Sequence, residues 1–113
     1  MKRGEVWIAA DRSGDYAGKP RPWLVVRSDV FSTFEGVTAV PLSSDVETAA
    51  ISPVVRVPIA AHPERLPLAR PSVAMADKVS TLRPERFRER VGTVSRAEMA
   101  TVGRALGSYL GLG

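Results

Sequence analysis

The residues of this chain best suited to chemistry are one arginine, two serines and one aspartate, each in or beside a predicted strand. Arg21 precedes Pro22, which fixes its own φ angle, lacks an amide donor and biases Arg21 toward an extended conformation. A guanidinium on so rigid a mount, between a loop and an apolar strand, is well placed to grip a phosphate. The alternative is a solvated arginine at a strand start, because short motifs often match by chance.

Ser43 and Ser44 end a predicted strand, and Asp77 lies among the apolar residues of another. Cleavage of RNA asks little of a protein, because the 2′-hydroxyl of the substrate can itself attack the phosphorus. An arginine with a hydroxyl across a groove can stabilise the charge that develops there. Asp77 is either a base with a raised pKa or the partner of a buried arginine, and the sequence favours neither.

The composition excludes most other catalytic chemistries. The 113 residues contain no cysteine, which excludes disulfides, thiolate metal sites and cysteine nucleophiles. His62 is the single histidine, and in its proline-rich surroundings it is more typical of a solvated residue than of a catalytic one. The sequence also lacks the HExxH, P-loop and GxGxxG motifs. We therefore expect neither a metal nor a cofactor.

The charge distribution points to a polyanionic partner. The net charge is +4, and residues 1–28 and 81–113 each carry six Lys/Arg against three Asp/Glu, whereas residues 29–80 carry four against six. Two basic ends that meet in the fold would form one basic face; the alternative is a generally soluble surface. There is no long apolar run and no basic-then-apolar leader, so we expect a cytoplasmic protein.

Short strands followed by one helix must position these residues. A capping box formed by Ser95 and Glu98, followed by apolar residues at helical spacing, predicts a helix over 96–110. Long loops are predicted at 11–20 and 60–70. We expect one domain over 1–113, of mainly β (α+β) class: a small, partly open barrel of five to six antiparallel strands with a C-terminal helix. Alternation and β-branched residues predict strands over 4–10, 22–28, 37–42, 54–59, 72–82 and 88–94.

Five segments, in order along essentially the whole chain, resemble the MazF/PemK (Kid-like) toxins of bacterial type II toxin–antitoxin systems. The five together are more specific than any one of them. The matching segments are 2–7 (KRGEVW), 18–26 (GKPRPWLVV), 40–45 (VPLSSD), 71–81 (PSVAMADKVST) and 90–94 (RVGTV).

The resemblance implies an SH3-like barrel, a homodimer and a metal-independent, sequence-specific endoribonuclease. Such enzymes cut single-stranded RNA, typically mRNA, and leave a 2′,3′-cyclic phosphate and a 5′-hydroxyl. It also implies a MazE-like antitoxin that blocks the RNA groove.

The family's catalytic arginine falls on Arg21, and its threonine falls on Ser43, with Ser44 adjacent. Some members rely instead on an aspartate that falls on Asp77. There are departures: serine replaces threonine at 43, which keeps the hydroxyl but loses the stiff β-branch. Members that use the aspartate also use an arginine two residues earlier, where this chain has Met75, which weakens the assignment of Asp77 as a base.

RNA contacts are expected at the loop before Arg21. Lys19 and Arg21 would bind phosphates, and unpaired bases could stack on Tyr16 or Trp23, although Trp23 is more typical of a core. CcdB-like gyrase poisons share this fold, bind a protein target and cleave nothing. Arg21 together with Ser43 favours the nuclease over that alternative, and over an RNA-binding module that does not cleave.

Overall fold

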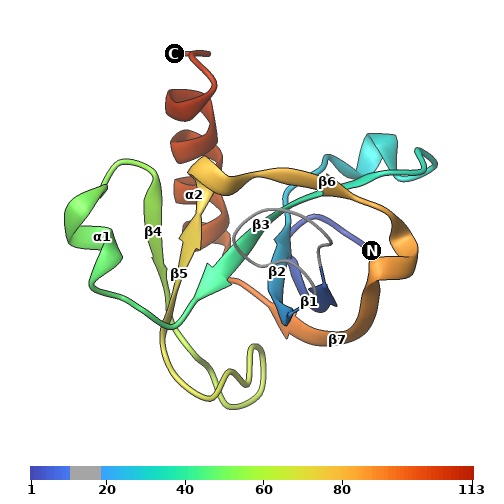
Figure 1. The fold of residues 1–113 in the computed structure, drawn as a ribbon, viewed down its shortest axis with the longest axis horizontal. Coiled ribbons are helices and arrows are strands. Elements are labelled where there is room, and N and C mark those ends of the chain that lie inside the picture. Colours follow the sequence, from blue (N-terminus) through green and yellow to red (C-terminus); the bar gives the residue numbers. More distant parts are fainter. Residues whose placement is uncertain (11–18) are drawn as a thin grey trace.

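The sheet is built from seven short strands, counted over residues 1–10 and 19–113, which the computed structural model describes (Figure 1). Tyr16 and nearly all of the predicted loop 11–20 lie outside these residues. The strands are β1 (Glu5–Ala10), β2 (Pro20–Val25), β3 (Val37–Ser43), β4 (Arg56–Ile59), β5 (Ser72–Met75), β6 (Ser80–Leu82) and β7 (Phe87–Thr93). The helical segments are η2 (Asp29–Phe31), α1 (Thr48–Ile51), η3 (Ala76–Lys78), η4 (Pro84–Arg86) and α2 (Arg96–Tyr109).

All strand pairs are antiparallel, in the order β4-β5-β3-β2-β1-β7, with β6 paired to β3 outside this path. The sheet curls into an incomplete barrel, with β4 and β7 at the two ends of the order (Figure 1). This confirms the mainly β, partly open architecture. The strand β4 contains Pro58 and lies at an edge, where a proline removes no ladder hydrogen bond.

The single strand predicted over 72–82 is wrong, because it is two strands separated by η3. β5 pairs with the end of β3 at Leu42 and Ser43, whereas β6 pairs with its beginning, Val37 to Ala39. The 3-10 turn thus moves the chain from one half of β3 to the other. Because of this break, the described residues form seven strands where five to six were predicted. The segment 45–52 also contains a short helix, α1, where no element was predicted.

The predicted C-terminal helix and its capping box are confirmed. The Ser95 hydroxyl accepts from the Glu98 amide at 3.1 Å, and a Glu98 carboxylate oxygen accepts from the Ser95 amide at 2.9 Å. Val102 and Ala105 of α2 are buried in the main core, where the helix packs beside β4 and η3 (Figure 1). None of the helices in the described part of the chain is long and apolar enough to span a membrane.

Candidate functional site

A cleft lies where three neighbouring strands meet. β2 and β5 are both antiparallel to β3 and flank it, so both begin at the end of the sheet where β3 stops. The cleft there has a volume of about 430 Å³, within the range of small-ligand sites. Its described lining contains three cationic side chains and no carboxylate. The lining residues are Lys19, Pro20, Arg21, Pro22, Leu42, Ser44, Leu68, Ala69, Arg70 and Ser72.

Arg21 is the second residue of β2 and is half-buried on the cleft wall. It pairs with Ala9 of β1, and the buried Trp23 follows two residues later. Trp23 pairs with Pro41, which is the last pair of the β2–β3 ladder. The same register, continued by two residues, would set Arg21 opposite Ser43 at the end of β3, and facing positions on paired strands have Cβ atoms about 5 Å apart. The fold therefore brings the two strand ends that carry these residues to the same end of the sheet.

The two serines lie differently. The Ser43 hydroxyl accepts a hydrogen bond of 3.1 Å from the amide of Asp45, which caps the turn after β3. Ser44 is exposed and, among the described residues, it is the serine of this pair that lines the cleft. Ser43 keeps its own proton for donation, so either hydroxyl can serve a phosphate oxygen.

Lys19 is exposed at the mouth of the cleft, on the segment that leads into Arg21. Tyr16, the predicted stacking residue, falls outside the described residues. Trp23, the other stacking candidate, is only 2% exposed and packs with Ala9, Ala39 and Leu82. Burial removes Trp23 from base stacking, in line with its core-like sequence context.

Asp77 is the partner of an arginine and not a base with a raised pKa. Its two carboxylate oxygens accept from Arg56 Nε at 2.7 Å and Arg56 Nη2 at 2.8 Å, and both side chains are largely shielded from solvent. The Arg56 hydrogen bonds lower the pKa of Asp77, against the opposing effect of partial burial. Asp77 lies in η3, within the predicted strand's span but outside β5 and β6, and does not line the described cleft.

His62 has a local structural role. Its Nδ1 accepts from the amides of Glu64 at 3.2 Å and Arg65 at 3.0 Å, while its backbone bridges to Leu66. These contacts shape the 60–71 loop on the far side of β3 from β2. They give His62 no place on the described cleft lining.

The sequence reasoning missed Arg70, which lines the cleft beside Ser72 at the start of β5. A signal was present, because Arg70 is followed by Pro71 as Arg21 is by Pro22. The Arg70-Pro71 pair does not stand out in the sequence, because its loop contains several other prolines. Only the shared neighbour β3 brings the two Arg-Pro pairs to one end of the sheet.

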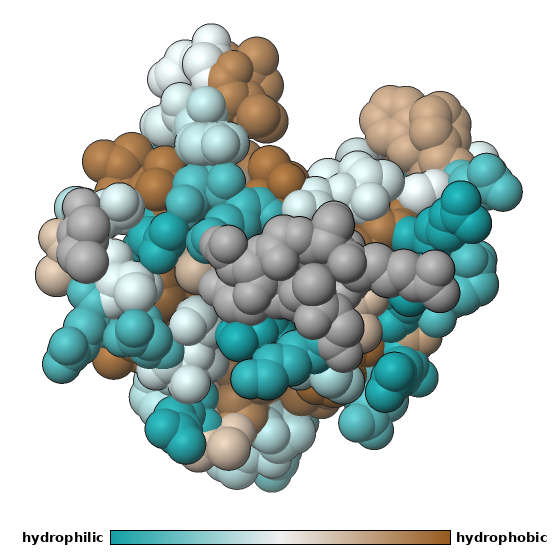
Figure 2. Space-filling view, viewed as in Figure 1, coloured by the Kyte–Doolittle hydropathy of each residue, from teal (hydrophilic) through white to brown (hydrophobic). Residues whose placement is uncertain are grey.

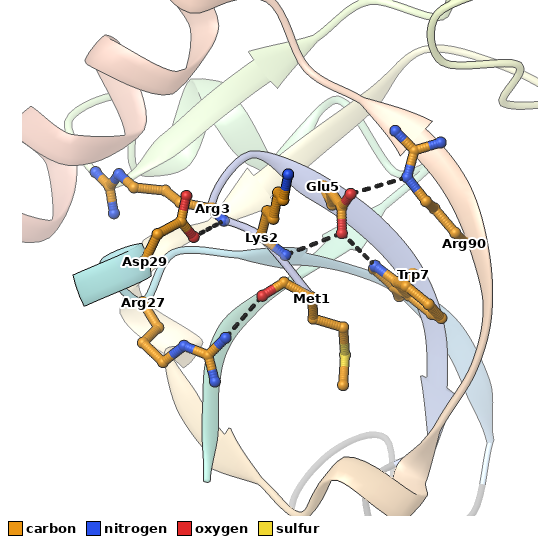
Figure 3. A network of polar contacts seen from close by, with 8 residues as sticks. All are labelled: Met1, Lys2, Arg3, Glu5, Trp7, Arg27, Asp29 and Arg90. Atoms are coloured by element: carbon orange, nitrogen blue, oxygen red, sulfur yellow. Dashed lines mark hydrogen bonds and ion pairs between the residues drawn. The ribbon is translucent and has the colours of Figure 1, made fainter. Parts of the chain in front are cut away.

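The conspicuous 2–7 motif serves the barrel itself. One Glu5 carboxylate oxygen accepts from the Lys2 amide at 2.9 Å and from Trp7 Nε1 at 3.0 Å, and the other accepts from Arg90 Nε at 3.0 Å (Figure 3). Partial burial would raise the pKa of Glu5, but these hydrogen bonds outweigh it and lower the pKa. The network joins β1 to β7.

A second part of the same network ties the N-terminal residues to the segment after β2. The Arg3 amide donates to Asp29 at 2.7 Å, and Arg27 Nη2 donates to the Met1 carbonyl at 2.7 Å (Figure 3). The Arg3 guanidinium donates to the Val26 carbonyl. These contacts secure the barrel around the β1–β2 pair and involve no residue of the described cleft.

Residues 2–110 match the family of PemK-like, MazF-like toxins of type II toxin–antitoxin systems. A probable endoribonuclease MazF of Mycolicibacterium smegmatis (strain ATCC 700084 / mc(2)155) is 37% identical over 112 residues, which cover 99% of this chain and 98% of that protein. A solved endoribonuclease from a mycobacterial species, in complex with its cognate antitoxin, is 27% identical with a TM-score of 0.75, over 100% of this chain and 97% of that one. The MazE–MazF complex (Form-II) from Deinococcus radiodurans is 25% identical with a TM-score of 0.74, over 98% and 95% of the two chains.

Proposed function

Since this chain belongs to the PemK-like, MazF-like toxins of type II toxin–antitoxin systems, we propose that it is a metal-independent endoribonuclease. Its substrate is single-stranded RNA, mRNA in particular, cut at specific sequences so that translation and growth stop. The observation that carries this proposal is the cleft that joins Arg21 to the serine end of β3, in a lining of three cations. Such a lining suits a phosphodiester and leaves the nucleophile to the substrate.

The reaction is a transesterification within the RNA. The 2′-oxygen loses its proton and forms a bond to phosphorus, the bond from phosphorus to the 5′-oxygen breaks, and that oxygen gains a proton. The products are a 2′,3′-cyclic phosphate and a 5′-hydroxyl. Arg21 stabilises the added negative charge on the phosphoryl oxygens, and Ser43 or Ser44 donates a further hydrogen bond. Lys19 holds the strand near the mouth of the cleft, and Tyr16 is the residue proposed to stack a base.

Cleavage in a chelator tests this function directly. Purified protein is incubated with a long RNA in EDTA, beside the Arg21→Ala variant, and the 3′ ends of the fragments are analysed. We expect discrete fragments with cyclic phosphate ends from the parent and none from the variant. Intact RNA with the parent protein, together with inhibition of gyrase, would instead indicate a CcdB-like poison; intact but bound RNA would indicate a binding module.

The cleft also suits an antitoxin. Both solved relatives described above are complexes, one with its cognate antitoxin and one of MazE with MazF. We propose that a MazE-like partner of this chain covers the basic cleft with an acidic segment that folds on binding. Such a segment competes with RNA. An antitoxin peptide that inhibited cleavage without displacing labelled RNA would contradict this arrangement.

We further propose a homodimer that works in the cytoplasm, where mRNA is found. β4 and β7 are the two edge strands of the sheet, and apolar surface gathers at the free end of α2 and over the β2–β3 connection (Figure 2). The exposed apolar residues there are Val30, Phe31, Phe34, Tyr109, Leu110 and Leu112. Light scattering at micromolar concentration tests the assembly, and a fully active monomer would contradict it.

A further inference from the structure

Two Arg-Pro pairs flank the end of β3. Arg21-Pro22 lies at the start of β2, and Arg70-Pro71 lies immediately before β5, on the opposite side of β3. Both arginines line the same cleft. Arg70 is exposed, and its guanidinium makes no hydrogen bond or ion pair with any other described residue. Arg56, by contrast, donates two hydrogen bonds to Asp77.

The backbone around Arg70 is restrained, as is the backbone around Arg21, by a proline that follows the arginine. Pro71 fixes its own φ angle and restricts Arg70 to an extended conformation. The Arg70 carbonyl accepts from the hydroxyl of Ser72, a buried residue, at 3.4 Å. Upstream, the 60–71 loop is pinned to β7, where the Thr93 amide donates to the Arg65 carbonyl at 2.9 Å. The backbone of Arg70 is therefore held in place, and only the rotamer freedom of its side chain is lost when the guanidinium binds an anion.

The same loop is anchored in the core. Leu66 is completely buried, and its backbone exchanges two hydrogen bonds with His62, of 2.8 and 3.1 Å. Gly92 of β7 lies against the Arg65 carbonyl so closely that a side chain at position 92 would collide with it. These contacts hold the loop against the barrel on the side of the cleft that faces Arg21.

The two arginines start from strands that are not neighbours in the sheet. β2 and β5 are separated by β3, so their backbones are two strand spacings apart, about 10 Å. The described lining between them holds no carboxylate that could neutralise either cation. When Arg21 binds one phosphodiester of an RNA strand, Arg70 is therefore available for a neighbouring phosphate of the same RNA.

We propose that Arg70 forms a second phosphate subsite, which binds a non-scissile phosphate next to the one held by Arg21 and so fixes the RNA across the end of β3. This inference rests on the proposed ribonuclease function. Arg70 contributes to binding and placement of the strand, whereas the charge that develops during cleavage is met by Arg21.

The first experiment measures binding and cleavage for Arg70→Ala and Arg70→Lys, with Arg104→Ala as a charge-matched control on the exposed face of α2. Binding uses an RNA with a 2′-deoxy nucleotide at the cut site. We expect Arg70→Ala to weaken binding about tenfold, to raise KM with little change in kcat, and to reduce the salt slope by about 0.7, the value for one phosphate on a single strand. Arg70→Lys recovers most of the affinity, because a point charge suffices there.

The second experiment locates the contact. Each phosphate of a short substrate is replaced in turn by an uncharged methylphosphonate, and binding is measured for the parent, Arg70→Ala and Arg104→Ala. We expect one position beside the scissile phosphate to cost affinity in the parent and in Arg104→Ala but not in Arg70→Ala. If every position costs the same in Arg70→Ala as in the parent, or if both alanine variants keep the parental salt slope, the second subsite is wrong while the ribonuclease stands. A parent that neither binds nor cuts RNA overturns both proposals.

Discussion

In the proposed reaction, Arg21 acts through the shape of its head group as well as its charge. The guanidinium is planar and can bind two phosphate oxygens at once, and its half-buried place at the start of β2 limits its freedom. We expect Arg21→Ala to abolish cleavage and Arg21→Lys to recover little of it, with a loss of about 10²–10³ in the rate at saturating RNA. Circular dichroism should show an intact fold for both, because Arg21 is not in the core.

The contrast with Arg70 makes this prediction specific. Lysine should substitute well at position 70 and poorly at position 21. Only the residue at 21 is proposed to bind the scissile phosphate, whose geometry at phosphorus changes during cleavage. If folded Arg21→Ala cut RNA at the parental rate, the assignment of the active site to this cleft would be wrong.

The two serines are separable by substitution. Ser43 lies at the same end of the sheet as Arg21 but caps the turn to Asp45, whereas Ser44 lines the cleft. We expect that changing the serine that donates to the phosphate to alanine lowers the cleavage rate about 10- to 1000-fold. The upper end of this range is what the loss of one such donor usually costs. Ser43→Thr should retain activity, because it keeps the hydroxyl.

Single-turnover rates of Ser43→Ala and Ser44→Ala, with thermal melts, decide between them. A lower melting temperature with an unchanged rate would assign Ser43 to the turn alone and leave the chemistry to Ser44. His62→Ala serves as a neutral control for the chemistry, because its contacts lie within the 60–71 loop.

The sequence could point to Arg21 and Ser43 as candidates because each adjoins a strong strand signal, and an antiparallel pairing of the two strands would bring them to the same end of the sheet. It could not choose between the two roles of Asp77, because Arg56 lies 21 residues away and meets it only through the β4–β5 pairing. The sequence could not single out Arg70 for the same reason. Arg70 and Arg21 line one cleft only because β2 and β5, which are far apart in sequence, both pair with β3.

At the scale of elements, the Arg56–Asp77 pair ties β4 to the break between β5 and β6. Both side chains are less than a quarter exposed, and the two hydrogen bonds are charge-assisted. We expect Asp77→Asn to lower the free energy of unfolding by about 1.5–3 kcal/mol, because it weakens both hydrogen bonds and leaves the arginine charge partly desolvated. Urea unfolding measures the change, with the exposed Glu85→Gln as a control.

Activity gives this prediction a second readout. The folded Asp77→Asn variant should cleave RNA at close to the parental rate below its unfolding transition. A selective loss of kcat with unchanged stability would instead place Asp77 in the chemistry.

The helix α2 was predictable because its capping box and apolar spacing are local signals. The break at η3 was not, because Ala76, Asp77 and Lys78 include neither glycine nor proline and their neighbours alternate like a strand. The strand is interrupted where the chain changes its pairing along β3, because β5 pairs with the end of β3 and β6 pairs with its beginning. Tertiary pairing therefore overrides the local pattern.

At the scale of the whole molecule, the two basic ends of the chain do meet, because β1 pairs with β7. Part of that charge is neutralised there, since Arg90 is bonded to Glu5. The cationic lining of the cleft draws instead on Lys19 and Arg21 from the first segment and on Arg70 from the acidic middle of the chain. Overall charge balance thus indicated a polyanion partner correctly in kind but did not locate the surface.

Two carboxylates, Glu5 in this network and Asp77 in the separate pair with Arg56, make the stability of the barrel depend on pH in the acid range. Glu5 and Asp77 have pKa values lowered from their ordinary 4.5 and 3.8, so the unfolded chain binds protons more readily than the folded one. Their contribution is present in full above the ordinary values and is lost as the pH falls toward and through the lowered ones. We expect the free energy of unfolding to be constant between pH 7 and 6 and to fall by on the order of 1–3 kcal/mol between pH 5 and 3.

Urea unfolding followed by tryptophan fluorescence and circular dichroism at each pH measures this fall, and Glu5→Gln tests its cause. Glutamine keeps the size of the side chain and one acceptor oxygen but cannot titrate, so the variant should be less stable than the parent at pH 7 and should lose less stability on acidification. The two curves should approach each other as the pH falls through the lowered pKa of Glu5, because the parental carboxylate then becomes protonated. Parallel curves across the whole range would mean that the carboxylate bonded to Lys2, Trp7 and Arg90 does not contribute to holding β1 against β7.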